Sequence, residues 1–140
     1  MTTGRTGDTS TPAPTAGLRH RILLVDDNVD EREALELFLG TEGFDVCCAS
    51  DGQQALDVLG SGLVHCLIVL DLNMPVMDGW EFRRRQLLWR EMAGVPVVIL
   101  SGHPELKAVT RGMQPREVWK KPVVLDQLLR AVSEHCPGVH

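Results

Sequence analysis

Short apolar runs alternate along the chain with amphipathic segments, and this alternation carries most of the structural information in the sequence. The runs are too short for buried helices, and polar residues bound them on both sides. This is typical of strands that are buried on both faces of a parallel sheet. We expect strands at residues 21–25, 44–49, 66–70, 96–100 and 117–120, the last being the least apolar.

The segments between the runs carry apolar residues at helical spacing. The clearest case is the last one, where Leu125, Leu128, Leu129 and Val132 share one helical face. Further helices are expected at residues 30–40, 53–59 and 79–92, and a weak one between residues 104 and 112, which contains helix-breaking proline and glycine.

Strands that alternate with helices form βαβ units around a mainly parallel sheet. Right-handed crossovers leave few ways to connect five such strands. We therefore predict an α/β fold with a doubly wound five-stranded parallel sheet in the flavodoxin-like order 2-1-3-4-5 and helices on both faces.

The length of 140 residues suits one domain. Residues 1–18 are rich in Thr, Gly, Pro, Ser and Ala, so we expect them to form a disordered tail. The folded domain is expected at residues 19–136 and a short tail at 137–140. With no further domain expected, the protein would act through contacts with other proteins.

Composition excludes several classes of function. The net charge of −5 disfavours nucleic-acid binding, and no apolar run is long enough for membrane insertion. The four cysteines (Cys47, Cys48, Cys66 and Cys136) include no C-x-x-C pair. We expect them as free thiols in a reducing, cytoplasmic setting, without disulfides. The basic run at residues 83–85 is expected to be a solvated helix face.

Polar residues end the predicted strands. Asp26 and Asp27 follow the first strand, Asp71 the third, Ser101 the fourth and Lys121 the fifth. Because the carboxyl ends of parallel strands meet at one sheet edge, these side chains should converge. Converging carboxylates repel each other, and a divalent cation such as Mg²⁺ relieves the repulsion. A carboxylate can also attack phosphorus and form an aspartyl phosphate.

Four motifs at these strand ends resemble the receiver domain of two-component response regulators. They are residues 24–28 (LVDDN), 70–79 (LDLNMPVMDG), 98–102 (VILSG) and 121–122 (KP). The resemblance, which runs from about residue 21 to residue 136, implies a phosphorylation switch of the chemotaxis-regulator kind. It implies a phosphoacceptor with autocatalytic phosphorylation and dephosphorylation, and not an enzyme acting on external substrates.

The resemblance also implies a role for each site residue. Asp71 would be the phosphoacceptor. Asp27, Asp71 and the backbone carbonyl of Asn73 would bind Mg²⁺, or Mn²⁺ as an alternative, while Asp26 would act mainly through a metal-bound water. Lys121 would contact the phosphoryl oxygens, across a cis peptide bond to Pro122.

Other residues would couple and tune this chemistry. Ser101 would move to contact the phosphoryl group, and Gly102 would leave room for the donor. Asn73 and His103 lie where side chains of the family tune dephosphorylation. The donor would be a phosphohistidine on a sensor histidine kinase or a histidine phosphotransfer protein, and the output a downstream protein whose identity is unknown.

The sequence departs from the receiver family at one position near the end of the fifth predicted strand. Receivers carry Tyr or Phe three residues before the strand-end lysine, whereas this chain has Val118. The adjacent Trp119 should point to the opposite face of its strand, where it would be either a packing residue or an output contact. The segment from Ser101 to Lys121 is also shorter than in typical receivers. We therefore hypothesise that the chain signals through an altered surface formed by the fifth strand and the helix before it, or through another face.

Three alternative functions differ in class. An aspartate-based phosphatase typically carries a second acid two residues after its nucleophile, and here that residue is Asn73. A nucleotide or flavin binder needs a glycine-rich phosphate loop after the first strand, where this chain has Asp26 and Asp27. A degenerate receiver that only docks to partners is disfavoured by the intact acidic set, although Val118 supports it.

Overall fold

The computed structural model describes residues 21–136. The tails predicted at residues 1–18 and 137–140, and the predicted start of the domain at residue 19, lie outside the described residues. Within the described range, no helix has both the length and the apolar character needed to span a membrane.

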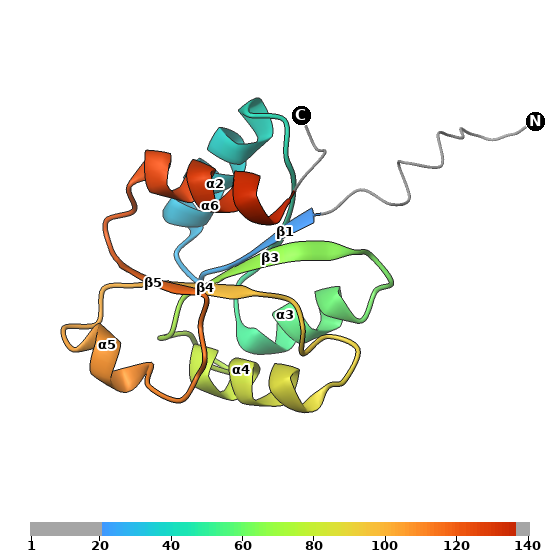
Figure 1. The fold of residues 1–140 in the computed structure, drawn as a ribbon, viewed down its shortest axis with the longest axis vertical. Coiled ribbons are helices and arrows are strands. Elements are labelled where there is room, and N and C mark those ends of the chain that lie inside the picture. The colour runs from blue at the N-terminus through green and yellow to red at the C-terminus, as the bar shows by residue number, and fades with distance from the viewer. Residues whose placement is uncertain (1–20, 137–140) are drawn as a thin grey trace, which may run out of the picture.

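The sheet has the predicted architecture. Its five strands pair in parallel in the order β2-β1-β3-β4-β5, which confirms the predicted topology (Figure 1). The strand bounds are β1 Arg21–Val25, β2 Asp45–Ala49, β3 His65–Leu70, β4 Val97–Ser101 and β5 Glu117–Lys120. Strand β3 is buried along its whole length, as its central position requires.

Helices cover both faces of the sheet (Figure 1). Helices α2 and α6 lie on one face, and α3, α4 and α5 pack on the other. Their bounds are α2 Val29–Thr41, α3 Gly52–Leu59, α4 Gly79–Leu88, α5 Leu106–Val109 and α6 Leu125–His135. Each face has its own apolar core, so both sides of β1, β3 and β4 are shielded from water.

Three helices begin at side-chain caps. Asn28, Asp51 and Asp78 each accept a hydrogen bond from the backbone amide three residues later, at 2.9–3.0 Å. Such caps satisfy amides that the first helical turn leaves unpaired. They set where α2, α3 and α4 start.

Helix α4 ends at Leu88, four residues before the predicted end at Met92. The side-chain amide of Gln86 donates to the carbonyls of Met92 and Val95, at 2.9 and 3.0 Å. These bonds hold the following segment in a turn that leads directly into β4.

The prediction that the cysteines form no disulfide is wrong. Cys66 and Cys136 form a disulfide with a Cα–Cα distance of 5.4 Å, although 70 residues separate them in sequence. Cys66 lies at an irregularity in the β1–β3 pairing, and Cys136 directly follows α6. The inference of a reducing compartment therefore loses its premise. Cys47 and Cys48 are free and half-buried, and burial raises the pKa of the Cys48 thiol to about 11.

The expectation of a solvated basic run holds for Arg84 and Arg85 but is wrong for Arg83, which is buried. Its guanidinium donates to the carbonyls of Met113 and Gln114, at 2.8 and 2.9 Å. Burial occurs because the chain that links α5 to β5 passes over α4 and presents these carbonyls to Arg83.

Candidate functional site

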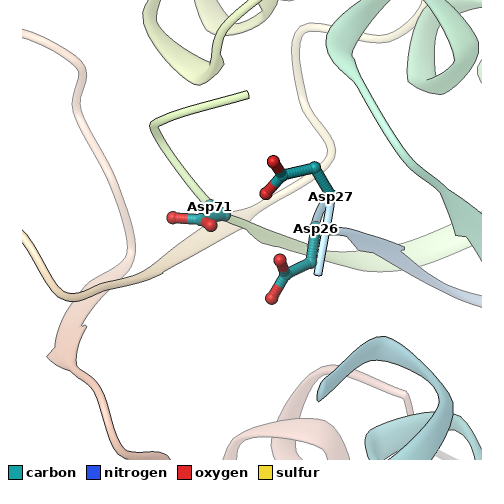
Figure 2. A group of neighbouring side chains, drawn as sticks. All are labelled: Asp26, Asp27 and Asp71. Carbon is teal, nitrogen blue, oxygen red and sulfur yellow. The ribbon is translucent and has the colours of Figure 1, made fainter. Parts of the chain in front are cut away.

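Three aspartates gather at the carboxyl edge of the sheet, beside β1 and β3. Asp26 and Asp27 follow β1 and Asp71 follows β3, and Figure 2 shows their side chains around a common space. One oxygen from each carboxylate lies within 4.8 Å of the others. Asp26 and Asp71 are buried, whereas Asp27 is exposed. The strand pairing thus brings together the acidic set that the sequence predicted for this edge.

Burial dominates the electrostatics of Asp26. It raises the pKa of Asp26 to about 6, because the carboxylate loses hydration. The nearby charge of Asp71 acts in the same direction, while the Asn28 amide and Lys121 oppose it. The Asn28 amide donates to Asp26 Oδ1 at 2.9 Å. A further cation at this place would favour the ionised form.

Lys121 directly follows β5 and supplies the positive charge. Its backbone amide donates to the Ser101 carbonyl at 3.0 Å, and its peptide bond to Pro122 is cis. Its Nζ lies 3.2 Å from Asp26 Oδ2 and 3.2 Å from Asp71 Oδ2. Burial lowers the pKa of Lys121, but the hydrogen bond to Glu31 and the charges of Asp71 and Asp26 outweigh it, so the pKa is raised.

The Asp71 carboxylate is held from two sides. Its Oδ1 accepts a hydrogen bond from the Leu72 amide at 2.7 Å, and its Oδ2 faces Lys121. The loop after Asp71 returns to the same place, because the Gly79 amide donates to the Leu72 carbonyl at 2.8 Å. A Cβ at Gly79 would lie 2.4 Å from the Asp71 carbonyl oxygen. A glycine at position 79 is therefore needed for this close approach.

The residues predicted around the phosphoryl site lie at the same edge. Ser101 is buried at the end of β4, and its Oγ accepts from the His103 amide at 3.3 Å. Gly102 is exposed, with open space where a Cβ would stand. His103 is half-buried, with its ring edge-on to Trp80, and Asn73 is exposed in the loop after Asp71.

Val118 and Trp119 lie on opposite faces of β5. Trp119 is buried in the core beneath α2 and α6, and its Nε1 donates to Glu117 Oε1 at 2.9 Å. It is a packing residue, so the option of an exposed output contact is wrong. Val118 is half-buried on the other face and lines a pocket with Pro104 and Lys107. No register slip brings Trp119 to the face of Val118.

Glu31 is a site residue that the sequence analysis missed. It lies in the first turn of α2, and its Oε1 is 2.5 Å from Lys121 Nζ. Lys121 therefore has a third carboxylate partner, on the solvent side of the aspartates. The available signal was its position in a helix that starts directly after the Asp26–Asp27 strand end.

The donor set fits a hard divalent cation. Three carboxylates offer oxygen atoms close together, and two of these side chains are buried. Oxygen ligands of this type suit Mg²⁺, which keeps several waters and binds phosphate oxygens. A carboxylate between such a cation and an ammonium group can act as a nucleophile toward phosphorus.

Comparison with known proteins agrees with this arrangement. A family model described as response regulator receiver domain matches residues 22–133. The chain is 37% identical over 97 residues to the DNA-binding response regulator MtrA of Mycobacterium tuberculosis, an alignment that covers 69% of this chain and 41% of the relative. The chain therefore spans less than half the length of this relative.

Solved structures agree as well. The chemotaxis response regulator CheY4 of Vibrio cholerae is 27% identical with a TM-score of 0.73, and the match covers 83% of this chain and 98% of that chain. The response regulator protein TrrA of Thermotoga maritima, solved in complex with Mg²⁺–BeF, is 27% identical with a TM-score of 0.72, covering 82% and 97%.

Proposed function

The chain belongs to the response regulator receiver domain family, and from this premise we propose that it is a phosphorylation switch whose acceptor is Asp71. Members of the family act in general as phosphoacceptors and not as enzymes with external substrates. The observation that carries the assignment is the position of the Asp71 carboxylate, which lies beside both the Asp26–Asp27 pair and the Lys121 ammonium.

The proposed reaction is transfer from a phosphohistidine. An Asp71 carboxylate oxygen forms a bond to phosphorus while the P–N bond breaks, and the imidazole leaves and takes up a proton from solvent. Lys121 neutralises charge on the transferred oxygens, and Ser101 Oγ donates to one of them. A sensor histidine kinase or a histidine phosphotransfer protein would supply the phosphohistidine.

Asp26, Asp27, Asp71 and the backbone carbonyl of Asn73 are the groups we propose for holding Mg²⁺. When bound, the ion would supply charge neutralisation for the phosphoryl oxygens. The TrrA structure, described as a complex with Mg²⁺–BeF, supports this assignment by similarity. The crowding of three carboxylates around one space supports it independently.

A direct test uses phosphoramidate, a small donor with a P–N bond, together with Mg²⁺ and intact mass spectrometry. We expect one added phosphoryl group on the full chain and none on Asp71→Asn. Asp57→Asn, an exposed aspartate on α3, is the matched control and should behave as the unmodified chain does. Rapid donor turnover without an adduct would favour a phosphatase, and no reaction at all would favour a docking module. Either result would overturn the proposal.

We propose that the output passes through the segment between β4 and β5. Ser101 Oγ now accepts from the His103 amide, so its movement toward a phosphoryl group would release the chain that enters α5. Helix α5 has only four residues, and Val118 stands at the position where receivers carry an aromatic residue. With beryllofluoride as the phosphoryl mimic, the amide signals of residues 102–110 should shift. Unchanged signals there would contradict this route.

A further inference from the structure

Glu31 holds the shortest of the three contacts of Lys121. Its Oε1 lies 2.5 Å from Nζ, compared with 3.2 Å for the oxygens of Asp26 and Asp71. The two aspartates are buried, whereas Glu31 is exposed. The ammonium therefore lies between two inner carboxylates and one outer carboxylate, and only the inner ones belong to the acidic cluster around Asp27.

The backbone beneath Glu31 is fixed on both sides. The Glu31 amide donates to the Asn28 side chain at 3.0 Å, which caps α2. The next residue, Arg32, donates from its guanidinium to the Asp26 carbonyl at 2.7 Å. These two bonds tie the first turn of α2 to the end of β1, so the Glu31 side chain starts from a fixed point beside Lys121.

Open space adjoins the contact between Lys121 and Glu31. A cavity of about 340 Å³ lies between α2 and α6, and its walls include Glu31, Lys121, Leu35, Phe38 and Leu125. The Glu31 end is the polar part of a mostly apolar wall.

We propose that Glu31 is a positioning residue that becomes the principal partner of the Lys121 ammonium when a divalent cation binds the three aspartates. This inference rests on the proposed function. A cation at Asp26 and Asp71 competes with Lys121 for the same two carboxylates and repels its charge. Glu31 gives Lys121 a partner on the solvent side, so the lysine remains at the site while the inner carboxylates become available.

The effect depends on a difference between two states. Glu31 can favour cation binding only if its contact with Lys121 is stronger after binding than before. Before binding, Lys121 shares its charge among three carboxylates; afterwards, Glu31 is its principal partner. With glutamine at this position, Lys121 would remain with Asp26 and Asp71, and the incoming cation would have to displace it against a stronger attraction.

The test is a calorimetric titration of the full chain with Mg²⁺, without any phosphoryl donor. We expect Glu31→Gln to weaken Mg²⁺ binding about three-fold, the size that a partly exposed ion pair supports. Asp30→Asn is the matched control, because it removes the same charge from the same helical turn, where Asp30 makes none of the Lys121 contacts. It should change the affinity by much less.

A second measurement separates positioning from structure. With phosphoramidate, the Mg²⁺ concentration that gives half-maximal phosphorylation should rise about three-fold in Glu31→Gln, while the rate at saturating Mg²⁺ stays unchanged. Equal Mg²⁺ affinities in Glu31→Gln and the unmodified chain, or an equal loss in Asp30→Asn, would overturn the role of Glu31 alone. An unmodified chain that binds no Mg²⁺ would overturn the proposed metal site as well.

Discussion

Arg83 is buried and Lys121 is partly buried, and the surroundings of these two cations differ in kind. The Lys121 ammonium contacts three carboxylates, those of Asp26, Asp71 and Glu31. Arg83 donates to neutral oxygens, namely two backbone carbonyls and the side-chain carbonyl of Gln86 at 2.7 Å. The first arrangement balances charge against charge at the sheet edge. The second joins α4 to the chain that leads into β5.

The difference indicates which part of the molecule can respond to a ligand. Carboxylates that hold Lys121 can accept another cation in its place, because a divalent cation also neutralises their charge. The oxygens that hold Arg83 are neutral, and two of them belong to the backbone; leaving such oxygens unpaired in a buried place is costly. We therefore regard the Lys121 cluster as an exchangeable site and the Arg83 cluster as a fixed support.

The largest effect is expected from replacing the fixed cation. Arg83→Met keeps most of the apolar volume but removes three hydrogen bonds and leaves buried carbonyls unpaired. We expect a loss of about 3 kcal/mol in the free energy of unfolding, measured by urea denaturation. Mg²⁺ should not restore it. Arg84→Met is the control, because Arg84 is exposed and pairs only with Glu81 at the surface, so its loss should be small.

Replacing the exchangeable cation should give a smaller and conditional loss. Lys121→Met leaves Asp26 and Asp71 facing each other without an ammonium, and we expect a loss of about 2 kcal/mol in metal-free buffer. Saturating Mg²⁺ should reduce this loss, because the ion supplies the missing charge. If Mg²⁺ also reduced the loss in Arg83→Met, or left that of Lys121→Met unchanged, the distinction between the two cations would fail.

The exchangeable site was predictable because it follows from topology. Apolar runs identify buried parallel strands, and the carboxyl ends of such strands share an edge, so Asp26, Asp27, Asp71 and Lys121 could be brought together before any coordinates. The resemblance at four strand-end motifs then indicated the chemistry. Glu31 was missed because its contact depends on the direction of a long side chain.

The Arg83 cluster could not be predicted from the order of the strands. Arg83, Arg84 and Arg85 look alike in sequence, and only the path of the α5–β5 loop distinguishes them. The disulfide, like the burial of Arg83, depends on how distant segments are placed. Cys66 and Cys136 meet only because β3 is irregular at one end and α6 ends beside it, and neither feature has a local signal in the sequence.

The smallest effect we expect is a dependence of the free energy of unfolding on pH, which comes from Asp26. Burial raises its pKa to about 6 from an ordinary value of 3.8, so between these values the folded state binds more protons than the unfolded state. Stability from this group is therefore present at low pH and is lost as pH rises through about 6. Asp26→Asn removes the titration.

We expect the free energy of unfolding of the unmodified chain, relative to Asp26→Asn, to fall by about 1 kcal/mol from about pH 5 to about pH 7 in metal-free buffer. Urea denaturation at both pH values measures this difference, and Asp57→Asn on α3 serves as the control with no such change. Saturating Mg²⁺ should shrink the pH dependence, because the ion favours the ionised carboxylate. A difference that rose with pH would mean that Lys121, and not burial, determines the pKa of Asp26. The cluster would then be a fixed structural ion pair and not an exchangeable site.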